Sequence, residues 1–193
     1  MNTVYIGYDP KEDTAYEVLK NTIQRISGKN SPRIVPLRKD ILELTGMYTR
    51  KSEMIDDQPY DIIDGKPFST EFSFSRFLVP ALNMYQGKAL FMDSDMYIRA
   101  DINELFDLCD MDYYPVYCVH HKYEPEKTTK MDGKEQHSYR RKNWSSLMMF
   151  NCEHALNKQL TPKVVNTQTG RWLHGFGWLP DKEADIGRIP EEW

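Results

Sequence analysis

Two carboxylates, Asp93 and Asp95, stand directly after the apolar run Ala89–Met92. Side chains alternate along an extended segment, so residues two apart point to the same side. The pair can therefore converge on one hard cation, and a cation held by two carboxylates keeps open positions that substrate phosphates can fill. In open α/β sheets, ligands bind beyond the carboxyl ends of the strands. The pattern predicts a site for a metal-bound diphosphate.

The spacing alone is weak, because a second pair with the same spacing occurs at Asp110 and Asp112. That pair precedes the apolar run Tyr113–Val119, so it lies at the entrance of a predicted strand, which is the wrong end for a ligand crevice. We interpret it as a solvated turn. Asp93 and Asp95 differ, because ending a buried strand with two carboxylates is costly unless something pairs them.

The start of the chain predicts a strand, a tight turn and a helix. Thr3–Tyr8 is rich in β-forming residues. Asp9 is a candidate N-cap, Pro10 suits the first turn, and Glu12 would complete a capping box. Apolar residues then recur at helical spacing until Gly28. The three elements form the opening of a βαβ unit.

The rest of the chain predicts further strands and helices. Pro36 places the strand Arg33–Arg38 at an edge or at its own end. The other expected elements are a long polar connection at 46–68, a helix from Ser69 or Thr70 through Tyr85 bent by Pro80, the strand Ala89–Met92, a short helix capped by Asp101, and strands at Tyr113–Val119 and Ser145–Phe150. Residues 160–193 are rich in turns and aromatic residues. We expect one α/β domain over residues 1–193.

Composition narrows the function classes. The net charge of −4 argues against a nucleic-acid surface, although Lys122–Arg141 is locally basic and is interpreted as a loop near an anionic ligand. Three cysteines, odd in number and widely spaced, predict reduced thiols in a cytoplasmic protein. The sequence shows no signal peptide and no apolar stretch of the roughly 20 residues that a membrane helix needs.

Two segments, Phe74–Leu82 and Lys88–Phe106, together resemble the central block of glycosyltransferase family 8. That family comprises GT-A-fold enzymes related to glycogenin and bacterial lipopolysaccharide galactosyltransferases. Its pattern is a helix carrying an Arg, a strand, Asp-x-Asp, and an Asp-[Ile/Leu]-x-x-Leu-[Phe/Trp] segment. The similarity extends from Val4 to about Asn151 and is clearest in the centre.

The resemblance implies a Rossmann-like GT-A domain with a mixed central sheet. Residues 1–112 would bind the nucleotide-sugar, and residues 113–193 would form the acceptor half. Enzymes of the family transfer a sugar from a nucleotide-sugar, usually UDP-linked, with retention of anomeric configuration, using Mn²⁺ or Mg²⁺. The expected partners are therefore a UDP-sugar donor and a hydroxyl acceptor, a glycan.

Carried over by position, the resemblance makes Asp93 and Asp95 the metal ligands and brings Ser94 to the ribose. Arg76 would lie near the donor sugar or the diphosphate; the alternative is a surface arginine on an amphipathic helix. Tyr8 and Asp9 would contact the base. A helix cap at Asp9 can coexist with a base contact, because one carboxylate accepts several hydrogen bonds.

The chain departs from the family at three places. Family members carry Asn-Ser-Gly where this chain has Trp144–Ser146, although Asn143 lies next to it. The family's third metal ligand, a late His, is matched only in part by His174. We expect either that the native protein continues beyond Trp193 to supply this ligand or that the chain binds metal more weakly. The residue that opposes the leaving phosphate is not identifiable.

Four other functions are compatible with parts of the pattern. A sugar-nucleotidyltransferase should show a Gly-rich phosphate loop after the first strand, and Gly7–Glu12 is not one. A phosphatase would place Asp-x-Asp on its first strand. A retaining glycosidase needs two carboxyl groups about 5 Å apart in different roles. A non-catalytic binding module of the same fold remains open, because the family Asn is replaced and the third ligand is uncertain.

Overall fold

The computed structural model describes residues 1–109, 113–121, 143–181 and 184–193. Its strands are β1 Thr3–Gly7, β2 Arg33–Leu37, β3 Ser52–Ile55, β4 Gln58–Asp61, β5 Lys88–Met92, β6 Val116–Val119, β7 Leu147–Asn151 and β8 Ile186–Ile189. Its α-helices are α1 Asp13–Ser27, α2 Lys39–Leu44, α3 Val79–Leu82, α4 Ile102–Leu108, α5 Pro162–Thr167 and α6 Gly170–His174. Short 3-10 helices are η1 Pro10–Glu12, η2 Gly28–Asn30, η3 Ser75–Leu78, η4 Trp144–Ser146 and η5 Asn157–Gln159.

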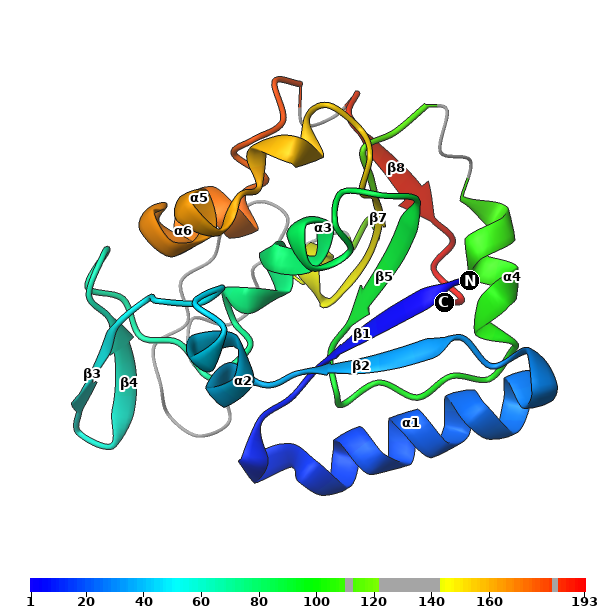
Figure 1. Ribbon diagram of the computed structural model, residues 1–193, viewed down its shortest axis with the longest axis horizontal. Helices are drawn as coiled ribbons and strands as arrows, with labels where there is room; N and C mark the ends of the chain where they lie inside the picture. The colour runs from blue at the N-terminus through cyan, green and yellow to red at the C-terminus, as the bar shows by residue number, and fades with distance from the viewer. Residues whose placement is uncertain (110–112, 122–142, 182–183) are drawn as a thin grey trace.

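A six-stranded mixed sheet with the order β2-β1-β5-β7-β6-β8 forms the centre of the molecule (Figure 1). β1 pairs in parallel with both β2 and β5. β7 is inserted antiparallel between β5 and β6, and β8 pairs in parallel with β6. The carboxyl ends of β2, β1 and β5 therefore meet the amino end of β7 at one edge of the sheet.

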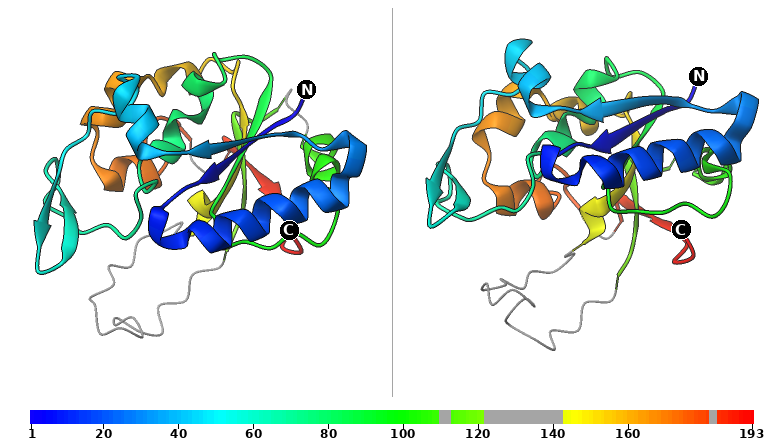
Figure 2. Two further views of the ribbon diagram at one scale, coloured as in Figure 1. Left: turned by 60° about the horizontal axis from the view of Figure 1, so that its bottom comes forward. Right: turned by 90° about the horizontal axis from the view of Figure 1, so that it is seen from below.

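Helices cover both faces of this sheet. In Figures 1 and 2, α1 and α4 lie on one face, and α3, α5 and α6 lie on the other. Strand alternation divides the core in the same way: Val4 and Ile6 pack toward α1 and α4, whereas Tyr5 packs toward the opposite layer. The predicted α/β class with a mixed central sheet is confirmed.

Several predicted elements form where the sequence places them. Gly28 follows α1 with a positive φ of 53°, a conformation that glycine adopts without strain. The strand that carries Pro36 is the edge strand β2. Asp101 caps α4 by accepting a hydrogen bond from the backbone N–H of Asn103. These elements are specified by short-range signals, which explains why the sequence alone predicts them.

The predicted helix from Ser69 or Thr70 to Tyr85 is wrong in its extent, because only Ser75–Leu82 is helical. The chain instead forms turns, then η3 and the short helix α3. Pro80 lies at the start of α3, where its missing N–H costs no hydrogen bond. Met84 and Tyr85 have positive φ values of 55° and 53°, so the chain leaves helical geometry after Leu82.

Two regions expected to be loops contain regular structure. The connection at 46–68 holds the β3–β4 hairpin, whose turn residues Asp56 and Asp57 both have positive φ, as a type I′ turn requires. Residues 160–193 form α5, α6 and β8, and Phe176 and Trp178 are buried in the core.

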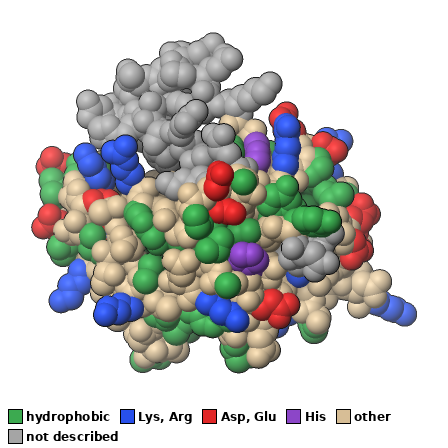
Figure 3. Space-filling view, turned by 90° about the horizontal axis from the view of Figure 1, so that it is seen from above, with side chains coloured by type: hydrophobic (Ala, Val, Ile, Leu, Met, Phe, Trp, Pro, Cys, Tyr) green, Lys and Arg blue, Asp and Glu red, His purple; other side chains and the backbone are tan. Residues whose placement is uncertain are grey.

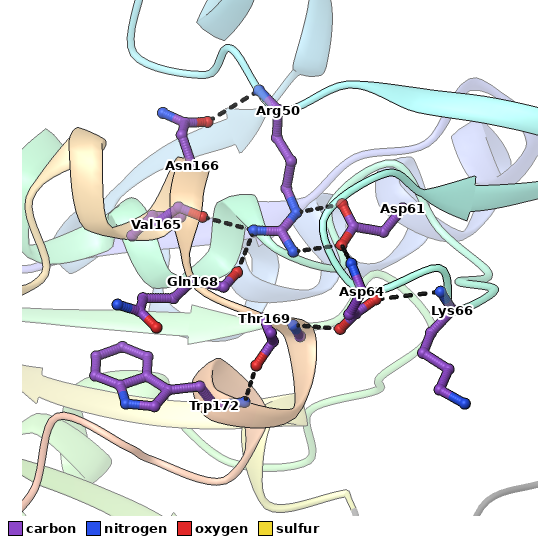
Figure 4. A network of polar contacts seen from close by, with 10 residues as sticks. Arg50, Asp61, Asp64, Lys66, Val165, Asn166, Gln168, Thr169 and Trp172 are labelled. Carbon is purple, nitrogen blue, oxygen red and sulfur yellow. Dashed lines mark hydrogen bonds and ion pairs between the residues drawn. The ribbon is translucent and has the colours of Figure 1, made fainter.

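The β3–β4 hairpin stands apart from the central sheet (Figure 2) and is anchored by a buried ion pair (Figure 4). Arg50 donates to both carboxylate oxygens of Asp61 at 2.7 Å. The same guanidinium donates to the backbone carbonyls of Val165 at 3.0 Å and Gln168 at 2.6 Å. Asp64 accepts a hydrogen bond from the backbone N–H of Gly170 at 2.8 Å. The hairpin is thus fixed to α5 and α6.

Candidate functional site

The predicted site residues lie at the sheet edge where β1 and β5 end. Tyr8 and Asp9 follow β1, and Asp93 and Asp95 follow β5. The two strands are parallel neighbours with Ile6 opposite Met92, so their carboxyl ends coincide. The structure therefore brings the two segments to the same edge of the sheet, which is the edge where ligands bind in open α/β sheets.

Asp93 is a largely buried carboxylate whose charge is incompletely compensated. Its Oδ1 lies 2.9 Å from Nη1 of Arg76, yet among the described residues this buried oxygen makes no hydrogen bond. Burial raises the pKa of Asp93, and the nearby Asp95 and Glu12 add to that effect, whereas Arg76 and Ser146 lower the pKa. A cation beside this carboxylate would supply the missing compensation.

Ser94 and Asp95 lie in a turn after β5, so the alternation expected for an extended segment does not apply to them. Asp95 is exposed, whereas Ser94 is 1% exposed and donates its hydroxyl hydrogen bond to Oε2 of Glu12 at 2.6 Å. The predicted capping box is therefore wrong in part, since the Glu12 side chain contacts Ser94 in the turn after β5 instead of returning to Asp9. Asp9 alone caps η1 by accepting from the backbone N–H of Lys11.

The chemistry of the donor set fits a divalent cation. Two carboxylates after one strand supply the oxygen ligands that Mg²⁺ and Mn²⁺ prefer. Within the described ranges, no three His, Cys, Asp or Glu side chains gather in a way that could hold a metal ion. The two carboxylates would therefore hold an ion together with water or substrate oxygens. This is the usual arrangement for a nucleotide-bound ion.

Arg76 is buried and is not the surface arginine that an amphipathic helix would carry. It is 6% exposed and lies over the rings of Phe72 and Phe91, at 5.3 Å and 4.8 Å from their centroids. Its Nη1 donates to the backbone carbonyl of Ser145 at 2.8 Å. These contacts hold the guanidinium beside Asp93, at the junction of β5 and β7. Its contact with a donor sugar or diphosphate stays a prediction.

His174 is connected to this junction through Ser145. Its Nδ1 lies 2.8 Å from Oγ of Ser145, and its ring packs edge-on against Phe77 at 5.1 Å. Burial, with help from the nearby Arg76, lowers the pKa of His174 to about 3, so the imidazole is neutral at physiological pH. Among the residues described, it does not gather with the carboxylates into a three-ligand group.

Tyr8 borders a small cavity at the ends of β1 and β2, and Asp9 is its buried neighbour in the sequence. The Tyr8 hydroxyl donates to Asp13 at 2.8 Å, which raises the pKa of Tyr8, and the guanidinium of Arg38 lies 5.3 Å from its ring centroid. Asp9 is 4% exposed and also accepts from the backbone N–H of Glu71 at 3.1 Å. The cavity, about 240 Å³, is lined by Tyr8, Pro10, Arg38, Lys39, Asp40, Glu43 and Glu71. The predicted base contacts of Tyr8 and Asp9 stay predictions.

Sequence analysis missed Glu12 and Ser145 as members of this site. Glu12 carried a signal in its position after the first strand, but its spacing from Asp9 also fits a cap. Ser145 acts mainly through its backbone carbonyl, which any residue could supply. The role of Ser145 can therefore be recognised only in the three-dimensional structure.

Other sequence predictions concern the surface and the cysteines. The second acidic pair, Asp110 and Asp112, and the basic stretch Lys122–Arg141 lie outside the described residues. On the face seen in Figure 3, acidic and basic side chains are interspersed among apolar ones. The cysteines Cys109, Cys118 and Cys152 are free, as predicted, and all three are buried. No helix in the described residues is long and apolar enough to cross a membrane. The cytoplasmic location stays a prediction.

Solved glycosyltransferase structures share this fold. The chain superposes on the apo structure of the bifunctional glycosyltransferase WbbM with a TM-score of 0.56 and 17% identity, covering 99% of this chain and 39% of WbbM. It matches the galactosyltransferase LgtC, solved with donor and acceptor sugar analogs, with a TM-score of 0.50 and 11% identity, covering 98% of this chain and 73% of LgtC. At these identities the matches establish the GT-A-type fold.

No family model matches the sequence. A curated relative does: Protein CDI of Arabidopsis thaliana is 47% identical over 190 residues, which cover 98% of this chain and 67% of that protein. The chain belongs to the Protein CDI family. Members at this identity share one fold, so the GT-A-type architecture extends to the aligned part of Protein CDI. The name of that relative carries no chemical information.

Proposed function

We propose that this member of the Protein CDI family is a glycosyltransferase that moves a sugar from a UDP-sugar to a hydroxyl acceptor, a glycan, with retention of configuration. The observation that carries the proposal is the largely buried Asp93 at the ligand edge of a GT-A-type sheet, whose Oδ1 is ion-paired with Arg76 but makes no hydrogen bond among the described residues. The fold shared with WbbM and LgtC supports the same function.

In this proposal, Asp93 and Asp95 hold Mn²⁺ or Mg²⁺, which would neutralise charge on the leaving diphosphate. Arg76 is held by Ser145 and by two aromatic rings, so its charge is already oriented toward the same region. A preorganised cation of this kind stabilises developing negative charge without reorganisation during the reaction. The small cavity beside Tyr8 would receive the base. The remaining chemistry is the positioning of the acceptor hydroxyl.

A binding module that holds nucleotide-sugars without turnover is the second candidate. One observation favours it: within the described part of the chain, His174, the partial match to the family's third metal ligand, does not gather with the two carboxylates. Such a module would bind UDP with metal and release none from a UDP-sugar.

The test is incubation of the purified chain with a panel of UDP-sugars and Mn²⁺, with detection of free UDP. The proposal predicts metal-dependent UDP release from at least one donor and a raised melting temperature in the presence of UDP and Mn²⁺. GDP-sugars and EDTA serve as controls. Stabilisation by UDP without release would support the module. If UDP neither raises the melting temperature nor is released from any UDP-sugar, both candidates are contradicted.

A further inference from the structure

Glu12 has an unusual orientation for a residue at the start of a helix. It occupies the N-cap position of α1, yet its side chain makes no capping hydrogen bond. Its Oε2 instead accepts from the hydroxyl of Ser94, which is buried between the two predicted metal ligands. A residue from the loop after β1 is thereby held against the loop after β5.

The sheet edge arranges the candidate ligand contacts in a fixed order. The cavity beside Tyr8 and Arg38 lies at the ends of β2 and β1. The contact between Glu12 and Ser94 joins the ends of β1 and β5. The pair of Asp93 and Arg76 lies at the ends of β5 and β7. A nucleotide placed along this edge with its base in the cavity and its diphosphate at Asp93 would bring its ribose to Glu12.

The charges of these groups support the same order. Arg76 brings a positive charge to Asp93, whereas Glu12 brings a negative charge to the neighbouring Ser94. A diphosphate is attracted to the first side and repelled by the second. A ribose is neutral and carries a vicinal diol that can donate two hydrogen bonds to a carboxylate, which has several acceptor sites. Dinucleotide-binding α/β folds use an acidic residue for ribose hydroxyls in this way.

We infer that Glu12 binds the ribose hydroxyls of the nucleotide, and that Ser94 positions the Glu12 carboxylate for this contact. The inference rests on the proposed function, since it concerns the same donor. It revises the role expected for Ser94, whose hydroxyl points to Glu12. The chain would therefore discriminate ribonucleotides from deoxyribonucleotides.

The test compares the affinities of UDP, 2′-deoxy-UDP and 3′-deoxy-UDP in the presence of Mn²⁺ by isothermal titration calorimetry. The unmodified chain should bind UDP at least about tenfold more tightly than one of the deoxy analogues, as expected for a lost hydrogen bond to a charged group. Glu12→Ala should reduce this ratio to within about threefold, mainly by weakening UDP. Glu12→Gln keeps the shape of the side chain and should also lower the ratio. Ser94→Ala should lower it less.

Glu17→Ala is the matched control, because Glu17 is a carboxylate of the following helix α1 whose side chain pairs only with Lys20 among the described side chains. It should leave the ratio unchanged. If both Glu12 variants lower the affinity for all three ligands by the same factor, Glu12 only supports the loop. That result would overturn this inference and leave the proposed function intact. Equal affinities of the unmodified chain for UDP and for both deoxy analogues would also overturn the inference. Failure of the unmodified chain to bind UDP with Mn²⁺ would overturn the proposed function as well.

Discussion

Two buried arginine–aspartate pairs in this molecule differ in how completely they are satisfied. Arg50 and Asp61 share two hydrogen bonds of 2.7 Å, and both side chains are at most 1% exposed (Figure 4). Arg76 and Asp93 make a single 2.9 Å contact, and the Asp93 side chain is 18% exposed. The first pair has further partners at nearly every polar atom, whereas Asp93 keeps a buried oxygen without a hydrogen bond.

This difference separates a structural pair from a binding pair. A carboxylate that already receives two guanidinium bonds and a backbone N–H has little left to offer a ligand. A carboxylate with one cationic neighbour and two acidic ones is stabilised when a further cation arrives. A buried charge alone therefore does not indicate a binding site. A buried charge that its neighbours compensate incompletely, at the edge of the sheet where ligands bind, does indicate one.

The largest effect is expected at the structural pair. Asp61→Asn should lower the free energy of unfolding by about 3–5 kcal/mol, because it leaves the Arg50 charge buried without a counter-charge. Urea denaturation measures this loss. The double substitution Arg50→Met with Asp61→Leu should recover much of it, since apolar groups of similar volume need no compensation. A loss below about 1 kcal/mol in Asp61→Asn would remove the distinction between the pairs.

A pH effect of intermediate size is expected next to the binding pair, at His174. Its folded-state pKa is about 3 against an ordinary value of 6.5, so between these pH values the unfolded chain binds more protons. The free energy of unfolding should therefore fall as the pH drops from 6.5 toward 3, by at most about 1.4 kcal/mol per pH unit from this group. His174→Gln should show a shallower fall than the unmodified chain in urea denaturation at stepped pH. Identical slopes for His174→Gln and the unmodified chain would refute this reasoning.

The same isosteric change at the binding pair should have a smaller effect on stability. Asp93→Asn leaves the buried Arg76 without its carboxylate partner, but it also removes a charge whose burial raises the pKa of Asp93, so the free energy of unfolding at pH 7 should fall by less than in Asp61→Asn. Differential scanning calorimetry and urea denaturation would report this. A loss comparable to that of Asp61→Asn would make Asp93 a structural residue.

The smallest effect is expected at an exposed ion pair, Arg188 and Glu191, whose side chains are 58% and 62% exposed. Glu191→Gln should change the free energy of unfolding by less than about 0.5 kcal/mol, because solvent screens such pairs. A larger loss of unfolding free energy, measured by urea denaturation, would show that burial does not determine how much each ion pair contributes to stability.

The sequence predicted what depends on short-range signals. The strand before Asp93 and Asp95, the helix that ends at Gly28 and the edge position of Pro36 all follow from local pattern, and the structure has each of them. The mixed sheet was predicted through the resemblance to a GT-A family.

The contacts between distant segments could not be predicted. Glu12 meets Ser94 across 82 positions, and Arg50 meets Val165 across 115. Contacts of this kind depend on the order of the strands in the sheet, and that order cannot be derived from a single sequence. The β3–β4 hairpin was missed for a different reason: its turn uses two aspartates in the left-handed region, where Asn-Gly or Asp-Gly is the stronger signal.

The most direct measurement is the affinity of UDP for the unmodified chain and for the double variant Asp93→Asn with Asp95→Asn, titrated with and without Mn²⁺. The account predicts Mn²⁺-dependent UDP binding that falls at least about 100-fold in the variant, since ligand carboxylates bind such ions only when charged. Circular dichroism would confirm that the variant is folded. Equal UDP affinity in both proteins, or UDP affinity that is indifferent to Mn²⁺, would contradict a metal-bound diphosphate at this edge of the sheet.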